Sequence, residues 1–276
     1  MRKTVILLLS LAMIASCNYR DKPVDKNGLF SSDYRLYQDT PAWELAKAVW
    51  DNDISKIDKE VRKNPQLLNY QEPKYGMSLL HMSSCNGQFK SFKELLRLGA
   101  NPNIYDFTHC TSPIIRCCLD YRDNTKYVAE LIKYGANVND RECGKGRAPQ
   151  KTEFTPIRAA AYSGNLRMVK LLVEKGANLN TQDNGLCTAI IQDHYDIALY
   201  LLEQGADCNG VIFKLEDGEH KWNYYIRDLV KDSEQEEVIK AKSINEVSGQ
   251  YVQGYRFRQA KEYPQIVEIL KKRGCM

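Results

Sequence analysis

The stretch Leu171-Leu172-Val173-Glu174-Lys175-Gly176-Ala177-Asn178-Leu179-Asn180 decides the fold of this chain. The same phrase returns at Leu95–Asn103, Leu131–Asn139 and Leu201–Asn209. Its glycines, Gly99, Gly135, Gly176 and Gly205, are separated by 36, 41 and 29 residues. A recurrence in the range of about 20–50 residues is the mark of an architecture built by stacking small repeated units.

The best-preserved copy also shows how each unit is punctuated. Thr155 can accept hydrogen bonds from the free N–H groups of a helix start, and Pro156 stands where its missing N–H costs nothing. Gly164 and Gly176 then end a first and a second helix, because glycine tolerates the left-handed conformation found there. The pattern predicts a helix, a tight turn and a second helix in every unit.

This pattern resembles the ankyrin repeat. Ser78-Leu79-Leu80-His81 stands where that family has its helix-opening motif, and the resemblance implies that His81 is structural. The implied fold class is all-α, an ankyrin-repeat solenoid of stacked helix-turn-helix units with hairpin-like finger loops. The family binds proteins, so the resemblance also implies an interaction module.

The repeats are expected within residues 41–209, at about 42–71, 75–105, 111–140, 153–182 and 184–209. Residues 210–276 read as a divergent C-terminal capping repeat with an insertion at 231–262. Asp217-Gly218 predicts a hairpin at the start of this part, because Asp-Gly favours a tight two-residue turn between strands.

The N-terminus has the composition of an export signal. Arg2 and Lys3 precede an apolar run from Val5 to Ile14, which is too short to span a bilayer as a mature helix. Ile14-Ala15-Ser16-Cys17 resembles a bacterial lipobox, which implies a signal peptide at 1–16 and lipid on Cys17. The alternative is an ordinary secretory signal with a chance cysteine. The lipobox resemblance implies that the protein is at the bacterial cell envelope. Residues 17–40 lack apolar periodicity, so we expect a flexible tether there.

Bulk composition is that of a folded protein with little net charge. Apolar residues make up 43% and charged residues 27% of the 276 residues, and the formal net charge is +4. So small a charge, without a basic stripe, gives no support to nucleic-acid binding.

No catalytic, metal or cofactor motif is found. His109-Cys110 and Cys117-Cys118 lack the spacing of zinc ligands, and Gly144-Lys145-Gly146 is not a phosphate loop. We therefore expect no catalytic residue, no metal and no cofactor. Cys85, Cys117 and Cys118 fall on positions where the family places small buried residues. We expect mostly free thiols and no disulfide framework, while oxidation of Cys208 and Cys275 stays open.

Protein binding is the remaining function, and the finger loops and the concave helix face of the solenoid are its candidates. They differ sharply between repeats, and tyrosine and arginine are enriched among the energetic centres of protein interfaces. Each of these positions can also be an ordinary solvated loop residue. The candidate partner-binding residues are Tyr105, Phe107, Arg141, Lys145, Arg147, Tyr162 and Asp183.

The favoured hypothesis is a monomeric, non-catalytic protein-interaction scaffold anchored at the bacterial envelope, with a protein partner and no small-molecule substrate. A neutraliser of a toxin or an exported enzyme is a sharper version of it. A thiol-dependent enzyme or redox protein is the main alternative, motivated by eight cysteines besides Cys17. A structural tether that uses the 231–262 insertion is a third.

Overall fold

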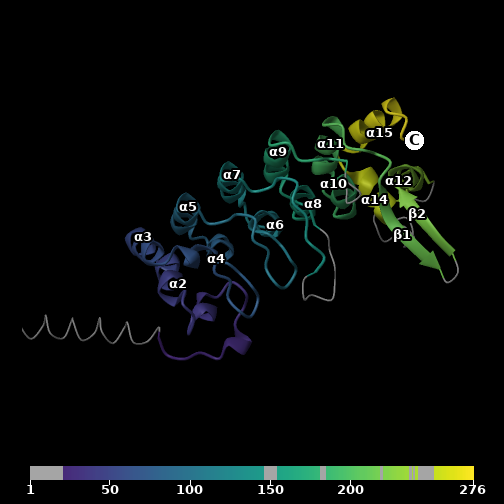
Figure 1. Ribbon diagram of the computed structural model, residues 1–276. Coiled ribbons are helices and arrows are strands. Elements are labelled where there is room, and N and C mark those ends of the chain that lie inside the picture. Colours follow the sequence, from purple (N-terminus) through teal and green to yellow (C-terminus); the bar gives the residue numbers. More distant parts are fainter. Residues whose placement is uncertain are drawn as a thin grey trace, which may run out of the picture. The chain divides into compact units, whose positions relative to one another are not determined.

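The computed structural model describes residues 21–145, 154–180, 185–217, 220–235, 238, 240–241 and 252–276. The predicted signal peptide and Cys17 lie outside the described residues. The chain forms two compact units, one ending at Thr108 and one beginning at His109 (Figure 1). Each unit is described by itself below.

The first unit contains two pairs of helices. α2 (Trp43–Trp50) and α3 (Ile54–Lys63) form the first pair, and α4 (Leu79–Cys85) and α5 (Phe89–Arg97) form the second. α2 packs on α4 and α3 packs on α5, so equivalent helices of successive pairs lie against each other. Leu45, Ile57 and Leu95 are completely buried between them. Each pair thus buries its apolar face on its neighbour, as stacked repeats require.

The start of α4 follows the opening motif read from the sequence. The Ser78 hydroxyl accepts from the His81 backbone N–H, and the His81 ring lies 2.9 Å from that hydroxyl and accepts from the Ser78 N–H. The His81 side chain is fully buried. The pair forms a reciprocal capping box, which gives His81 a structural role at the helix start.

Residues 21–40, here called the N-terminal strap, differ from the flexible tether expected over 17–40. The strap contains two short 3-10 helices, η1 (Lys26–Gly28) and η2 (Tyr34–Tyr37), and buries Leu36 and Tyr37. The Tyr37 hydroxyl donates to the Met77 carbonyl at 2.6 Å, and the Tyr34 ring stacks on both Trp43 and Trp50. Separate aromatic and leucine side chains hold the strap against the unit. A continuous apolar helix face is not needed, so the sequence of the strap shows no helical periodicity.

The second unit contains three pairs of helices and a divergent end. The pairs are α6 (Pro113–Leu119) with α7 (Thr125–Lys133), α8 (Pro156–Tyr162) with α9 (Leu166–Glu174), and α10 (Gly185–Ile191) with α11 (Tyr195–Glu203). The first helices pack in the order α6, α8, α10, and the second helices in the order α7, α9, α11 (Figure 1). Ala159, Ala160 and Ala161 are fully buried, because small side chains let the first helices approach closely.

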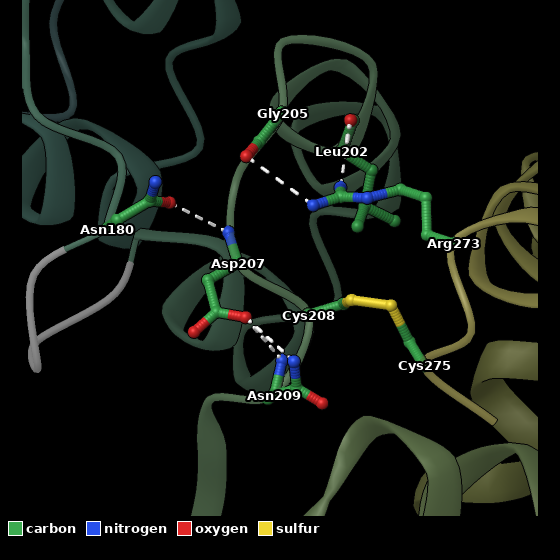
Figure 2. The surroundings of a disulfide bond; sticks show 8 residues. All are labelled: Asn180, Leu202, Gly205, Asp207, Cys208, Asn209, Arg273 and Cys275. Atoms are coloured by element: carbon green, nitrogen blue, oxygen red, sulfur yellow. Dashed lines mark hydrogen bonds between the residues drawn. A yellow bond between two sulfur atoms is a disulfide. The ribbon is translucent and has the colours of Figure 1, made fainter.

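The repeated phrase joins one repeat to the next. The Asn139 side-chain oxygen accepts from the Asn178 backbone N–H at 2.7 Å, and the Asn180 side chain accepts from the Asp207 N–H at 2.9 Å (Figure 2). In the first unit, the Asn69 side chain accepts from the Asn101 N–H in the same way. The phrase glycines all have positive φ, at Gly99, Gly135, Gly176 and Gly205. The phrase is therefore a helix stop followed by a hydrogen-bonded link between repeats.

The C-terminal part begins with the expected hairpin. β1 (Val211–Asp217) pairs antiparallel with β2 (His220–Tyr225), and these are the strands found in the described residues. α12 (Ile226–Ser233) follows, and α14 (Val252–Gln259) lies within the predicted insertion and packs on α12. A Cβ on Gly254 would lie 3.0 Å from the Asp232 and Ser233 backbone, so this close approach depends on glycine.

The last helix, α15 (Tyr263–Lys272), is fastened to α11. It packs on α11, and Arg273 donates to the carbonyls of Leu202 and Gly205 at the end of α11 (Figure 2). Cys275 forms a disulfide with Cys208 close by. The all-α repeat fold expected from the sequence is confirmed, with one hairpin added near the C-terminus.

Two disulfides overturn the expectation of mostly free thiols without a disulfide framework. Cys110 pairs with Cys143, and Cys208 pairs with Cys275, with Cα–Cα distances of 5.5 and 6.0 Å. Cys110 and Cys143 stand 33 residues apart, one repeat length, so the stacking of successive repeats brings them together. The cysteines that remain free in the described residues are Cys85, Cys117, Cys118 and Cys187.

Candidate protein-binding surface

Four side chains of the second unit form a group that we call the aromatic–arginine cluster: Tyr121, Phe154, Arg158 and Tyr162. Tyr121 is exposed, Arg158 and Tyr162 are half-buried, and Phe154 is buried. The Phe154 and Tyr162 rings meet edge-on at 5.4 Å, and the Arg158 guanidinium lies 4.9 Å from the centre of the Phe154 ring. Tyr121 is 75% exposed. The electrostatic interaction with Tyr162, desolvation and a hydrogen bond with Tyr162 raise the pKa of the Tyr121 hydroxyl, so the two hydroxyl groups lie next to each other.

α8 positions the cluster. The Thr155 hydroxyl caps this helix by accepting from the Arg158 N–H, and Pro156 occupies its first turn. The alanines between Arg158 and Tyr162 face the core, whereas these two residues, four apart, share the other face. The helix therefore presents an arginine and a tyrosine together, over the largely buried Phe154.

Tyr105 and Phe107, predicted as the tip of one finger, lie in the first unit. Phe107 is 37% exposed, and its N–H donates to the Tyr75 carbonyl at 2.7 Å. Its ring covers Gly76, where a Cβ would come within 2.3 Å of the ring. The Tyr105 carbonyl accepts from the Gln71 side chain at 2.7 Å. These aromatic residues thus combine partial exposure with a structural role in holding two fingers together.

The turn under Phe107 is made rigid by a buried carboxylate. Glu72 is completely buried and accepts from the backbone N–H groups of Lys74, Tyr75 and Met77 at 2.8 to 3.1 Å. Three backbone donors satisfy the charge, as a buried carboxylate requires. The finger in the first unit is consequently a fixed platform.

The finger loop that contains Arg141 and Lys145, here called the basic finger, is fixed at its base. Arg141 and Lys145 are exposed, while Glu142 between them is buried and accepts from the Phe154 N–H at 2.9 Å. The Cys110–Cys143 disulfide holds the same segment. Arg147 and Asp183, the other predicted contacts of the two fingers in this unit, lie outside the described residues.

Sequence reasoning identified Tyr162 but missed Tyr121, Phe154 and Arg158. Tyr121 belongs to the least regular turn, where Asp123 stands near the position of the usual glycine. Phe154 directly precedes the capping Thr155, and Arg158 lies one helical turn before Tyr162. The spacing of Arg158 and Tyr162 on one helix was a usable signal, whereas the approach of Tyr121 depends on stacking.

Two of the described thiols, Cys118 and Cys187, do not have the properties of nucleophiles. Burial, with a smaller contribution from the neighbouring Cys117, raises the pKa of Cys118 well above its ordinary value. Burial raises the pKa of Cys187 to about 12. Reactive thiols have a lowered pKa and partial exposure instead. Among the residues that the structure describes, no group of three His, Cys, Asp or Glu side chains could hold a metal ion.

An open pocket of about 550 Å³ lies where the N-terminal strap meets α2. Its charged pair, Asp33 and Arg35, is joined by short hydrogen bonds, including 2.7 Å from Arg35 Nη2 to Asp33 Oδ2. Burial alone would raise the pKa of Asp33, but the hydrogen bonds from Arg35 outweigh it and lower the pKa. The pocket is lined by Lys22, Pro23, Val24, Asp33, Tyr34, Arg35 and Trp50.

Comparison with known proteins gives the same family as the repeat pattern. A family model described as ankyrin repeats, in three copies, matches residues 80–183 and 114–211. An ankyrin repeat protein of fowlpox virus is 28% identical over 167 residues, 51% of this chain and 37% of that protein.

Two mammalian relatives match shorter stretches. The ankyrin repeat and SOCS box protein 3 of Bos taurus is 29% identical over 40% of this chain and 19% of its own length. The serine/threonine-protein kinase TNNI3K of Mus musculus is 30% identical over 45% of this chain and 14% of its own length. The matches span well under half of each relative. Residues 80–211 of this chain are therefore ankyrin repeats, a general protein–protein interaction module.

Proposed function

We propose that this protein is a non-catalytic scaffold that binds a protein partner through the aromatic–arginine cluster, together with the basic finger loop of the same unit. The observation that carries the proposal is the gathering of Tyr121, Phe154, Arg158 and Tyr162 on one surface of the second unit. Tyrosine and arginine dominate the energetic centres of protein interfaces.

The arrangement of the aromatic–arginine cluster fits a role in binding a partner better than a role in stabilising the fold. Tyr121 leaves three quarters of its surface in water, although a tyrosine gains from burial of its ring. The Arg158–Phe154 contact holds a guanidinium group 4.9 Å from the centre of an aromatic ring. A partner that offers an apolar surface with nearby acidic groups would match this set.

We also propose that the protein is exported and anchored at the bacterial cell envelope by lipid on Cys17. The lipobox-like Ile14-Ala15-Ser16-Cys17 motivates this proposal. The Cys110–Cys143 and Cys208–Cys275 disulfides support it, because disulfides persist in oxidising compartments and are rare in the cytosol. In the described part of the chain, no helix is long and apolar enough to cross a membrane.

The alternative of a thiol-dependent enzyme finds no support in Cys118 or Cys187. Cys118 and Cys187 are buried and have raised pKa values, so both are protonated near neutral pH. A nucleophilic thiol needs the opposite shift. We therefore propose binding without catalysis, cofactor or metal.

Affinity capture from a bacterial envelope extract tests the proposal. Wild-type protein is compared with Tyr121→Ala/Tyr162→Ala and with Tyr134→Ala, which removes a 37% exposed tyrosine at the end of α7. We expect a stoichiometric partner with wild type and with the Tyr134 variant, and loss of that partner with the double variant. Capture of no partner by wild type, or equal capture by all three proteins, would contradict the proposal.

A further inference from the structure

The beginning and the end of the N-terminal strap are joined by a buried amide. Gln38 is 4% exposed, and its side chain donates to the Lys22 carbonyl at 2.9 Å and accepts from the Val24 N–H at 3.2 Å. At the preceding residue, the Asp21 carboxylate accepts from Lys47 Nζ and from the Trp43 indole N–H, both at 2.8 Å. Residues 21–24 are thus held against α2.

A second clamp holds the middle of the strap. Lys74 Nζ donates to the carbonyls of Lys26, Asn27 and Leu29 at 2.7 to 3.2 Å. The Tyr75 hydroxyl donates to the Leu29 carbonyl at 2.8 Å. Both donors belong to the turn that Glu72 fixes from inside. The strap is therefore part of the rigid first unit up to the residue before Phe30.

Packing within the first unit does not explain why a large apolar side chain stands at position 30. Its side chain is 83% exposed, the highest value among the large apolar side chains of the described residues. An exposed aromatic ring next to a clamped backbone is presented to whatever covers this face of the unit.

Chain length limits the distance between Cys17 and this face. Five residues lead from Cys17 to Lys22, and an extended chain spans at most about 3.6 Å per residue, or roughly 18 Å. A lipid on Cys17 would therefore hold residue 22 within about 18 Å of the bilayer surface. No long tether is available to move the first unit away.

We propose that, in the lipidated protein, the N-terminal strap lies against the phospholipid bilayer and Phe30 enters its interfacial layer. The inference rests on the proposed lipidation of Cys17. The strap carries Lys22, Lys26 and Arg35 against Asp21, Asp25, Asp33 and Asp39, so its charges nearly cancel. Contact therefore comes from the anchor and from the aromatic ring, and it is insensitive to anionic lipid.

Photo-crosslinking on vesicles tests the orientation. The photoreactive amino acid p-benzoylphenylalanine replaces Phe30 in one protein and Lys90 in another. Lys90 is an exposed residue of α5, which lies away from the strap within the first unit (Figure 1). Full chains processed in bacteria are reconstituted in vesicles of phosphatidylethanolamine, with or without phosphatidylglycerol, and Cys17→Ser serves as the unlipidated control.

We expect flotation of the lipidated proteins, no flotation of Cys17→Ser, and lipid crosslinks at position 30 at least roughly five-fold above those at position 90 with either lipid mixture. Flotation with equal crosslinking at the two positions, or none at position 30, would overturn the orientation while leaving the anchor intact. Failure of the wild-type chain to float would overturn the anchor and, with it, this inference.

Discussion

At the scale of single residues, the asparagines of the repeated phrase are connectors. Asn139 accepts from the Asn178 N–H through Oδ1 and donates from Nδ2 to the Gly176 carbonyl at 3.2 Å. One side chain thereby satisfies two backbone groups of the following repeat. The phrase recurs because each junction needs the same two features, a left-handed glycine and an amide that reaches forward.

Replacing Asn139 tests this connector. We expect Asn139→Ala to lower the free energy of unfolding by about 1–2 kcal/mol, because two hydrogen bonds across the junction are lost. Asn139→Asp keeps the acceptor and loses the donor, so its effect should be smaller. Urea denaturation followed by circular dichroism measures both. Wild-type stability in the alanine variant would show that the connector contributes nothing.

Two glycines, Gly164 and Gly176, have similar backbone conformations but different surroundings. Comparing their alanine variants therefore distinguishes backbone strain from a steric clash. Gly164 has φ +72° and Gly176 has φ +86°. A Cβ at position 164 would lie 2.6 Å from the His194 ring, whereas nothing lies within 4 Å of one at position 176.

We expect Gly176→Ala to cost about 1–2 kcal/mol of unfolding free energy from left-handed strain alone. Gly164→Ala should cost about 1–3 kcal/mol more, because the methyl group displaces His194. Thermal and urea denaturation of the two variants measure the difference. Equal losses would mean that His194 moves aside freely.

The buried thiols make a prediction about reactivity. Cys187, with a pKa of about 12, holds a thiolate fraction at pH 8 about 10³-fold below that of an ordinary cysteine. We expect slow alkylation of Cys118 and Cys187 in the native protein and fast alkylation in urea, mapped by mass spectrometry. The native alkylation rate of Cys187 should rise with pH throughout the range in which the protein stays folded. A fast-reacting native thiol at either position would revive the enzyme hypothesis.

At the scale of elements, each disulfide closes a long loop. The bonded cysteines are separated by 33 residues in one case and by 67 in the other. The first holds the base of the basic finger, and the second fastens α15 to the end of α11, beside the Arg273 contacts (Figure 2).

Breaking the first disulfide should cost stability. We expect Cys110→Ser/Cys143→Ser to lower the free energy of unfolding by about 3–4 kcal/mol, because the loop is no longer restricted in the unfolded chain. Guanidinium denaturation without reductant measures this loss, and Cys85→Ser is a control that leaves both disulfides in place. A midpoint unchanged from wild type would show that the bond does not form or does not stabilise the unit.

The secondary-structure elements differ in whether they could be predicted from the sequence. Helix pairs were predictable because their stops and caps are local: glycine after a leucine pair, Thr155 before Pro156, and Ser78 three residues before His81. The hairpin was predictable from Asp217-Gly218 for the same reason. The strap was not, because Tyr37 meets Met77 and Lys74 meets Lys26 across 40 and 48 residues.

The candidate site was only partly predictable for a similar reason. Tyr162 stands on a regular helix and was identified, whereas Tyr121 lies in an irregular turn and reaches Tyr162 only once α6 and α8 are stacked. The disulfide partners likewise become neighbours through the repeats and through the return of α15. The amino-acid sequence alone therefore did not predict the contact between Tyr121 and Tyr162 or the pairing of the cysteines.

At the scale of the whole molecule, rigidity and anchoring define what kind of partner fits. The strap leaves little chain between Cys17 and the first unit, so lipidation would hold the first unit close to the membrane. The binding surface offers tyrosine, phenylalanine and arginine without catalytic chemistry in the described residues. We therefore propose an adaptor whose specificity comes from the side chains of the aromatic–arginine cluster.

Titration of the captured partner against purified variants tests this claim most directly. Isothermal calorimetry should show that Tyr121→Ala/Tyr162→Ala weakens binding at least roughly 30-fold, or about 2 kcal/mol, as loss of interface hot spots does. Tyr134→Ala should stay within about two-fold of wild type. Equal affinity of the double variant and wild type would contradict the account.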